Sequence, residues 1–229
     1  MTDNNSIYNA ITKIAFAYIL ILIKIMIVTI DILPDFIGYL MILNAAASLK
    51  NECKTISLLK PFCVILAIWN FITFIFDLFG INSVTVPVDA VSVIIVYIIS
   101  FITMIISLIS IYFNYQMSTE MSLLAAKYHN DKLSKTFITR RNIITVCQTV
   151  IFLINNITPV FNGIPDDIRY YLMIIPGLIA LAVMFLIVSA LFSLRKEFKD
   201  NQQNLNNIAD ANSDLSYNNN DINSDISAG

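Results

Sequence analysis

The sequence predicts an all-α polytopic membrane protein in which six transmembrane helices form three hairpins and both termini face the cytoplasm. Composition is the first observation behind this prediction. Hydrophobic residues make up 57% of the 229 residues and charged residues 13%, against about 25% charged in an average soluble domain. The mean hydropathy is +0.74. A chain this apolar needs lipid as part of its solvent, which excludes a soluble enzyme and a nucleic-acid-binding protein.

Six apolar stretches are the second observation, since a spanning helix needs about 20 mostly apolar residues. The stretches are residues 8–30, 36–49, 61–80, 88–113, 143–162 and 170–194. The second stretch, with 14 residues, reaches only about 21 Å as a helix. It is either a short helix enclosed by protein or a re-entrant segment.

The flanks of these stretches divide the chain into three parts. The first stretch is too long for the apolar region of a signal peptide, and no basic segment precedes it, so we expect it to be retained. Residues 1–7 form a short cytoplasmic segment and residues 8–196 the membrane domain. Residues 197–229 are expected to be a disordered, Asn-rich cytoplasmic tail, because they contain almost nothing that could form a core.

Charge is the third observation. If all six stretches span, the loops alternate between two sides, and twelve of the 14 basic residues lie near one side. These are Lys13, Lys50, Lys54, Lys60, Lys127, Lys132, Lys135, Arg140, Arg141, Arg195, Lys196 and Lys199. Arg169 is the only base on the other side, where the acidic residues are Asp31, Asp35, Asp89, Asp166 and Asp167. The positive-inside rule places the basic side in the cytoplasm.

The longest segment between spans is the cytoplasmic loop 118–141. A short amphipathic helix is predicted within it from Met121, Leu123, Leu124, Lys127 and Tyr128. Such a helix lies in the headgroup layer with its lysines toward anionic lipid. The alternative is a docking site for a cytoplasmic protein partner.

Each outer turn carries a proline closely followed by an aspartate. The pairs are Pro34 and Asp35, Pro87 and Asp89, and Pro165 and Asp166. Proline suits the first turn of a helix, and the positive end of the helix dipole favours an acidic residue beside it. The motif therefore predicts the start of the descending helix of each hairpin. A ring of carboxylates that gathers cations is the alternative.

A polar residue stands ten residues before each of these prolines, inside an ascending span. The three are Lys24, Asp77 and Asn155. Ionisable groups inside a membrane are costly and usually face the bundle interior or a wet cavity. A buried Lys24–Asp77 pair with Asn155 nearby is therefore one prediction. The other is that Lys24 and Asp77 reach the outer interface separately.

The fourth span carries a stripe of polar residues spaced three or four apart, which is one face of a helix. They are Ser100, Thr103, Ser107, Ser110 and Asn114. Small hydroxyl residues commonly line helix–helix contacts in membranes, so such a contact is the first interpretation. A polar pathway is the second.

Catalytic motifs such as HExxH, GxSxG and a glycine-rich phosphate loop do not occur in the sequence. Three cysteines without a CxxC spacing and a single histidine, His129, argue against a disulfide framework and a zinc site. We therefore expect no enzymatic activity, no metal ion and no cofactor. An enzyme that acts on lipid through Asp35, Asp89 or Asp166 is a further alternative.

Residues 30–40, which run IDILPDFIGYL, resemble a motif in an uncharacterised family of small multi-pass membrane proteins of low-G+C Gram-positive bacteria. The resemblance is strong over these 11 residues. It implies a bacterial plasma membrane and no particular activity.

These features predict a non-enzymatic membrane protein that binds or passes a small solute. The prediction depends on the similar depth of Lys24, Asp77 and Asn155 in the membrane and on the polar stripe of the fourth span. The alternative is a structural or accessory membrane protein that docks a partner through residues 118–141. The lipid bilayer is an expected partner in both cases.

Overall fold

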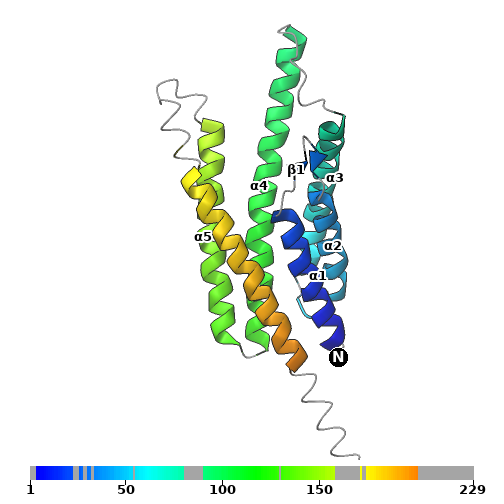
Figure 1. Ribbon diagram of the computed structural model, residues 1–229, viewed down its shortest axis with the longest axis vertical. Coiled ribbons are helices and arrows are strands. Elements are labelled where there is room, and N and C mark those ends of the chain that lie inside the picture. Colours follow the sequence, from blue (N-terminus) through cyan, green and yellow to red (C-terminus); the bar gives the residue numbers. More distant parts are fainter. Residues whose placement is uncertain are drawn as a thin grey trace, which may run out of the picture.

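The computed structural model describes residues 4–22, 26–27, 30–31, 34–53, 55–79, 90–128, 130–157, 171 and 174–200. This part of the chain is built mainly of six helices (Figure 1). In chain order the elements are α1 (Asn4–Leu22), β1 (Met26–Ile27), β2 (Ile30–Asp31), α2 (Asp35–Ser48), the 3₁₀ helix η1 (Ile56–Leu58), α3 (Leu59–Leu78), α4 (Ala90–Lys127), α5 (Asp131–Ile157) and the C-terminal helix (Ile174–Asp200). Five helices are long and apolar enough to cross a membrane, and α2 is shorter. The prediction of a helical chain with apolar helices of membrane-spanning length is confirmed for five helices.

The helices pack in two groups that meet at one end. α2 packs against both α1 and α3, and α4 packs along α5 (Figure 1). α3 also packs on α4, where the rings of Phe62 and Tyr112 lie 5.0 Å apart. The C-terminal helix contacts α1, since the rings of Phe16 and Phe192 lie 5.9 Å apart and the Arg195 guanidinium lies 4.9 Å from the Tyr8 ring centroid. The beginning of α1 and the end of the C-terminal helix therefore lie at the same end of the bundle. We call it the basic end, because Lys127 and Arg195 lie there.

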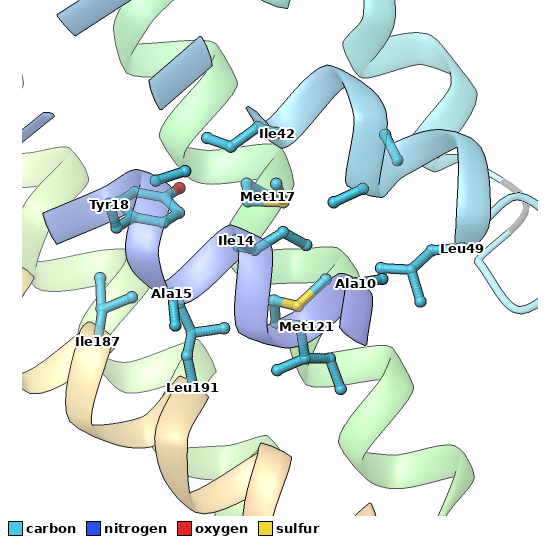
Figure 2. Close-up of a cluster of buried hydrophobic side chains, with 14 of the residues drawn as sticks. Ala10, Ile14, Ala15, Tyr18, Ile42, Leu49, Met117, Met121, Ile187 and Leu191 are labelled. Atoms are coloured by element: carbon cyan, nitrogen blue, oxygen red, sulfur yellow. The ribbon is translucent and has the colours of Figure 1, made fainter. Parts of the chain in front are cut away.

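The core occupies the half of the bundle nearer the basic end, with α1 at its centre. Ala10, Ile14, Ala15 and Tyr18 of α1 are at most 2% exposed. Figure 2 shows them between α2, α4 and the C-terminal helix. The side chains around them include Ile42, Leu49, Met117, Met121, Ile187 and Leu191. Apolar packing on three sides fixes α1 as the central helix.

The other half of the bundle exposes large apolar side chains in the single chain. Examples from α3, α4, α5 and the C-terminal helix are Phe71, Phe76, Ile94, Phe101, Leu153 and Leu178. Exposed apolar surface of this extent would be an aggregation hazard in water. It is the surface expected of helices that face lipid.

The first apolar stretch is not a single helix, which corrects the prediction for residues 8–30. α1 ends at Leu22, and β1 and β2 form a two-residue antiparallel ladder that pairs Met26 with Asp31 and Ile27 with Ile30. Counting apolar residues cannot separate a helix from a short hairpin, and β-branched isoleucine favours strands.

The segment 118–141 is not a loop with a separate helix, which corrects a second prediction. α4 continues to Lys127, a short turn follows, and α5 begins at Asp131. The 38 residues of α4 extend over about 57 Å, longer than the apolar thickness of about 30 Å. Met121 and Leu124 are 1% exposed, so their apolar face packs on protein and not on headgroups. The turn is closed by Asn130, whose Oδ1 accepts a hydrogen bond from the Leu133 amide at 2.9 Å, an N-cap for α5.

Candidate functional site: a polar groove between α4 and α5

A groove of about 530 Å³ lies between α4 and α5, on the half of the bundle away from the basic end. We call it the polar groove. Seven polar side chains line it: Ser100, Thr103, Ser107, Ser110, Gln148, Asn155 and Asn156. Apolar side chains such as Phe152 complete the lining, and the described lining contains no ionisable side chain.

The α4 wall of the groove is the polar stripe that the sequence predicts. Ser100, Thr103, Ser107 and Ser110 all line the groove, so the spacing of three and four identified the face correctly. The Thr103 hydroxyl donates to the Ile99 carbonyl oxygen at 2.9 Å, and the Ser107 hydroxyl donates to the Thr103 carbonyl oxygen at 2.9 Å. These two hydroxyl protons are therefore used within α4, and the hydroxyl oxygens keep their acceptor capacity.

The α5 wall combines the predicted Asn155 with two residues that the sequence reasoning missed. Gln148 precedes Asn155 by seven residues, which places both on one helix face, and this spacing was the available signal. The Oε1 atom of Gln148 is buried and has no hydrogen-bond partner among the described residues. The Asn156 amide donates to the Phe152 carbonyl oxygen at 2.8 Å. Within the described part of the chain, the Gln148 Oε1 atom is thus an unpartnered acceptor in the lining of the groove.

A second cavity, of about 280 Å³, adjoins the groove on its side toward the basic end. Ser110 and Gln148 line both spaces, and Tyr39, Asn114 and Gly177 line the second one. The Tyr39 and Ser110 side chains are hydrogen-bonded. Asn114, the last residue of the predicted stripe, is thus placed deeper in the bundle and not in the groove.

Lys24, Asp77 and Asn155, which are predicted to lie at one depth in the membrane, do not form one site in the structure. Lys24 lies outside the described residues, and α1 already ends at Leu22. Asp77 is half-buried on α3, one residue before the last residue of that helix, and it is not part of the polar-groove lining. Asn155 alone of the three lines the groove, because α5 supplies the wall opposite α4, whereas Asp77 lies on α3.

The outer-turn motif is described for the first hairpin. Pro34 is the N-cap of α2, with φ of −66°, and Asp35 is the first residue of the helix. The motif therefore starts α2 as predicted, with Asp35 in the first turn, where the helix dipole favours an acidic residue, and with the proline one residue before the first helical position. The other motif residues, Pro87, Asp89, Pro165 and Asp166, lie outside the described residues.

A polar cluster at the basic end, which the sequence reasoning also missed, surrounds Glu120. This residue is 1% exposed, and its carboxylate accepts hydrogen bonds from the Gln116 amide, at 3.0 Å, and from the Thr55 hydroxyl. Burial, and then the charges of Glu120 and Glu52, raise the pKa of the nearby Cys53 thiol to about 12. Cys53 is therefore a poor nucleophile at neutral pH. The described residues contain no group of three or more metal-ligating side chains.

Comparisons with protein-family models, with curated proteins and with solved structures found no match.

Proposed function

We propose that this protein crosses the plasma membrane six times, with its basic end in the cytoplasm, and binds a small uncharged solute in the polar groove. The observation that carries the binding proposal is the lining itself. It holds seven polar side chains and no ionisable one among the described residues, at a depth where the surrounding helix surface is apolar.

The chemistry of the lining indicates the class of solute. Thr103 and Ser107 use their hydroxyl protons on their own helix, and Gln148 holds a buried, unpartnered oxygen. A buried acceptor without a donor costs free energy, so a ligand that brings O–H or N–H groups is favoured. Because no described lining residue could neutralise a charge, the ligand is neutral, as a polyol or a carboxamide is. The volume of about 530 Å³ falls in the usual range of roughly 300–1,000 Å³ for small-molecule sites.

Two features support the proposed topology. The contact between Arg195 and Tyr8 places the beginning of α1 and the end of the C-terminal helix at one end, as an even number of crossings requires. α2 then crosses as a short helix packed against α1 and α3. The gathering of basic residues at this end supports a cytoplasmic location.

Thermal unfolding of the purified protein with a panel of neutral polyols and carboxamides tests the binding proposal. We expect at least one compound to raise the melting temperature, because a ligand at 100 times its Kd stabilises the folded state by about 2.7 kcal/mol. Gln148→Leu should abolish this shift. Thr149→Val is the matched control, since Thr149 is exposed on the same helix, lies outside the groove lining and bonds to the Thr145 carbonyl oxygen. A panel without any shift, or equal loss of the shift in both variants, would contradict the proposal.

A reporter enzyme that is active only in the cytoplasm tests the topology. Fused after Gly229 it should be active, and inserted within residues 80–89 it should be inactive. Activity at both positions, or at the second alone, would exclude the six-span arrangement.

Docking of a partner through residues 118–141 has less support. Met121 and Leu124 are each 1% exposed, so these two apolar residues are already used inside the bundle. Leu123, which is 57% exposed, is the remaining apolar candidate of the predicted helix. One exposed leucine is ordinary for a protein surface.

A further inference from the structure

Two adjoining depressions lie on the first turns of α5 near the basic end, and the smaller of them extends to the C-terminal helix. Their volumes are about 380 and 230 Å³. Both are lined by Lys132, Thr136 and Arg140, so they form one continuous surface. We call this surface the basic groove and define it by Lys132, Lys135, Thr136, Arg140, Ser189 and Ser193.

The three cations of the basic groove come from one helix, α5. Lys132, Thr136 and Arg140 follow one another at intervals of four residues, which keeps them on one side of the helix, and Lys135 lines the larger depression beside them. Arg140 is held across the helix gap, because its Nη1 donates to the Leu186 carbonyl oxygen of the C-terminal helix. No ion pair with an acidic side chain is found for these three cations within the described ranges. The carboxylate of Glu197 accepts a hydrogen bond at 2.6 Å from the Asn130 amide at the edge of the smaller depression. Within the described residues, the surface therefore carries three cations without a direct acidic partner.

Other cations near the basic end are already engaged by the protein. The Arg141 guanidinium lies 4.4 Å from the Tyr115 ring centroid and donates to the Thr119 hydroxyl at 3.0 Å. Lys127 forms an ion pair with Glu52 at 2.6 Å. These two cations are therefore not free to bind an anion in the way that the cations of the basic groove are.

The groove lies at the border of the apolar helix surface. On the side away from the basic end, the neighbouring exposed residues of the two helices are Ile143, Phe185 and Leu186, which are 41%, 52% and 48% exposed. On the other side are the exposed Lys132 and Lys135. This border is the depth at which phospholipid phosphates lie, and basic pockets between helices at that depth suit anionic headgroups.

We propose that the basic groove binds the phosphate of an anionic phospholipid from the adjacent leaflet, with the Lys132 and Lys135 ammonium groups and the Arg140 guanidinium around it. Acyl chains would then lie along the apolar surface that contains Phe185 and Leu186. A free phosphate ion shares the headgroup chemistry but gains nothing from that apolar surface. The lipid is therefore the occupant to which the geometry points.

Binding of phosphatidylglycerol to the full chain in a neutral detergent, followed by native mass spectrometry, tests this proposal. Phosphatidylcholine and inorganic phosphate are the comparison probes. We expect phosphatidylglycerol to bind at least tenfold more tightly than either probe. The double variant Lys132→Gln/Lys135→Gln should weaken phosphatidylglycerol binding by about tenfold or more, since each cation near an anionic lipid contributes roughly a fivefold factor.

The matched control is Lys196→Gln/Lys199→Gln, which removes the same charge from exposed positions on the C-terminal helix near the same end, outside the basic groove. It should change binding less than twofold. Equal loss in the two double variants would show that general surface charge acts and would overturn the proposal. Phosphatidylcholine bound as tightly, or inorganic phosphate bound as tightly as the lipid, would overturn it as well. The lysine pair is chosen over Arg140 because Arg140 also contacts the Leu186 backbone.

Discussion

Gly38 of α2 lies directly against the backbone of α1 at Ala17. A Cβ atom at position 38 would stand 2.8 Å from the Ala17 carbonyl oxygen and 2.7 Å from Cγ1 of Ile21. Because a backbone oxygen cannot move aside alone, Gly38→Ala must push α1 and α2 apart. We expect the free energy of unfolding to fall by about 1–3 kcal/mol, the usual cost of overpacking. Denaturant unfolding of the purified protein in detergent measures it.

Gly177→Ala is the matched control for this substitution. A Cβ atom at position 177 meets no atom within 4 Å, and alanine is a better helix former than glycine by about 1 kcal/mol. We therefore expect Gly177→Ala to be neutral or slightly stabilising. If Gly38→Ala left the free energy of unfolding as unchanged as Gly177→Ala does, α1 and α2 would not be as close at Gly38 as the structure has them.

Tyr18 and Asn114 are buried partners that are 96 residues apart in sequence, with the Tyr18 hydroxyl 3.4 Å from the Asn114 Oδ1. The distance is long for a hydrogen bond, so we expect a weak coupling. A double-mutant cycle with Tyr18→Phe and Asn114→Leu should give a coupling free energy of about 0.5 kcal/mol, near the average for polar pairs in membrane bundles. A coupling of zero would mean that the two side chains do not interact.

Glu120 should matter more for stability than the ion pair of Lys127 with Glu52. Glu120→Ala removes the acceptor of the Gln116 and Thr55 hydrogen bonds in a site that is 1% exposed, which costs about 1–3 kcal/mol. Lys127 is 52% exposed in its side chain, so Lys127→Gln should destabilise the protein less than Glu120→Ala does. Glu120→Gln, which keeps an oxygen acceptor, should fall between the two. The reverse order in urea titrations would contradict the buried position of Glu120.

Cys53 should react slowly with alkylating reagents in the folded protein. Its pKa is raised from 9.0 to about 12, and the thiolate is the reactive form. At pH 8 the thiolate fraction is then about a thousandfold smaller than in the unfolded chain. Because the pKa of Cys53 is raised, its alkylation rate should keep rising by about tenfold per pH unit above about pH 9. The alkylation rate of an ordinary thiol levels off there.

A variant with Cys63→Ala and Cys147→Ala isolates this reaction, and the maleimide rate as a function of pH measures it. Glu120→Gln should speed the reaction, because the Glu120 charge is one cause of the raised pKa. A rate that levels off near pH 9 in the folded protein would contradict the expectation.

The sequence predicts one wall of the polar groove and not the other. The spacing of Ser100, Thr103, Ser107 and Ser110 predicts one face of a helix, and these four residues do share one face. The sequence does not indicate that α5 supplies the opposite wall. Lipid and protein interior are both apolar, so hydropathy carries no contrast that would assign one helix face to a neighbour.

The apolar stretches by themselves determine a chain of apolar helices, five of them long enough to span a membrane, and the charge pattern predicts that the basic residues lie toward one side. Tertiary packing decides the rest. α4 continues to Lys127 because Met121 and Leu124 find a buried place against the bundle, and α1 stops at Leu22 where β1 and β2 pair. Asn155 meets the α4 stripe while Asp77 does not, since α5 packs along α4 and α3 packs along α2. Local sequence determines what each segment can form, and the contacts between segments determine where it ends and which residues it meets.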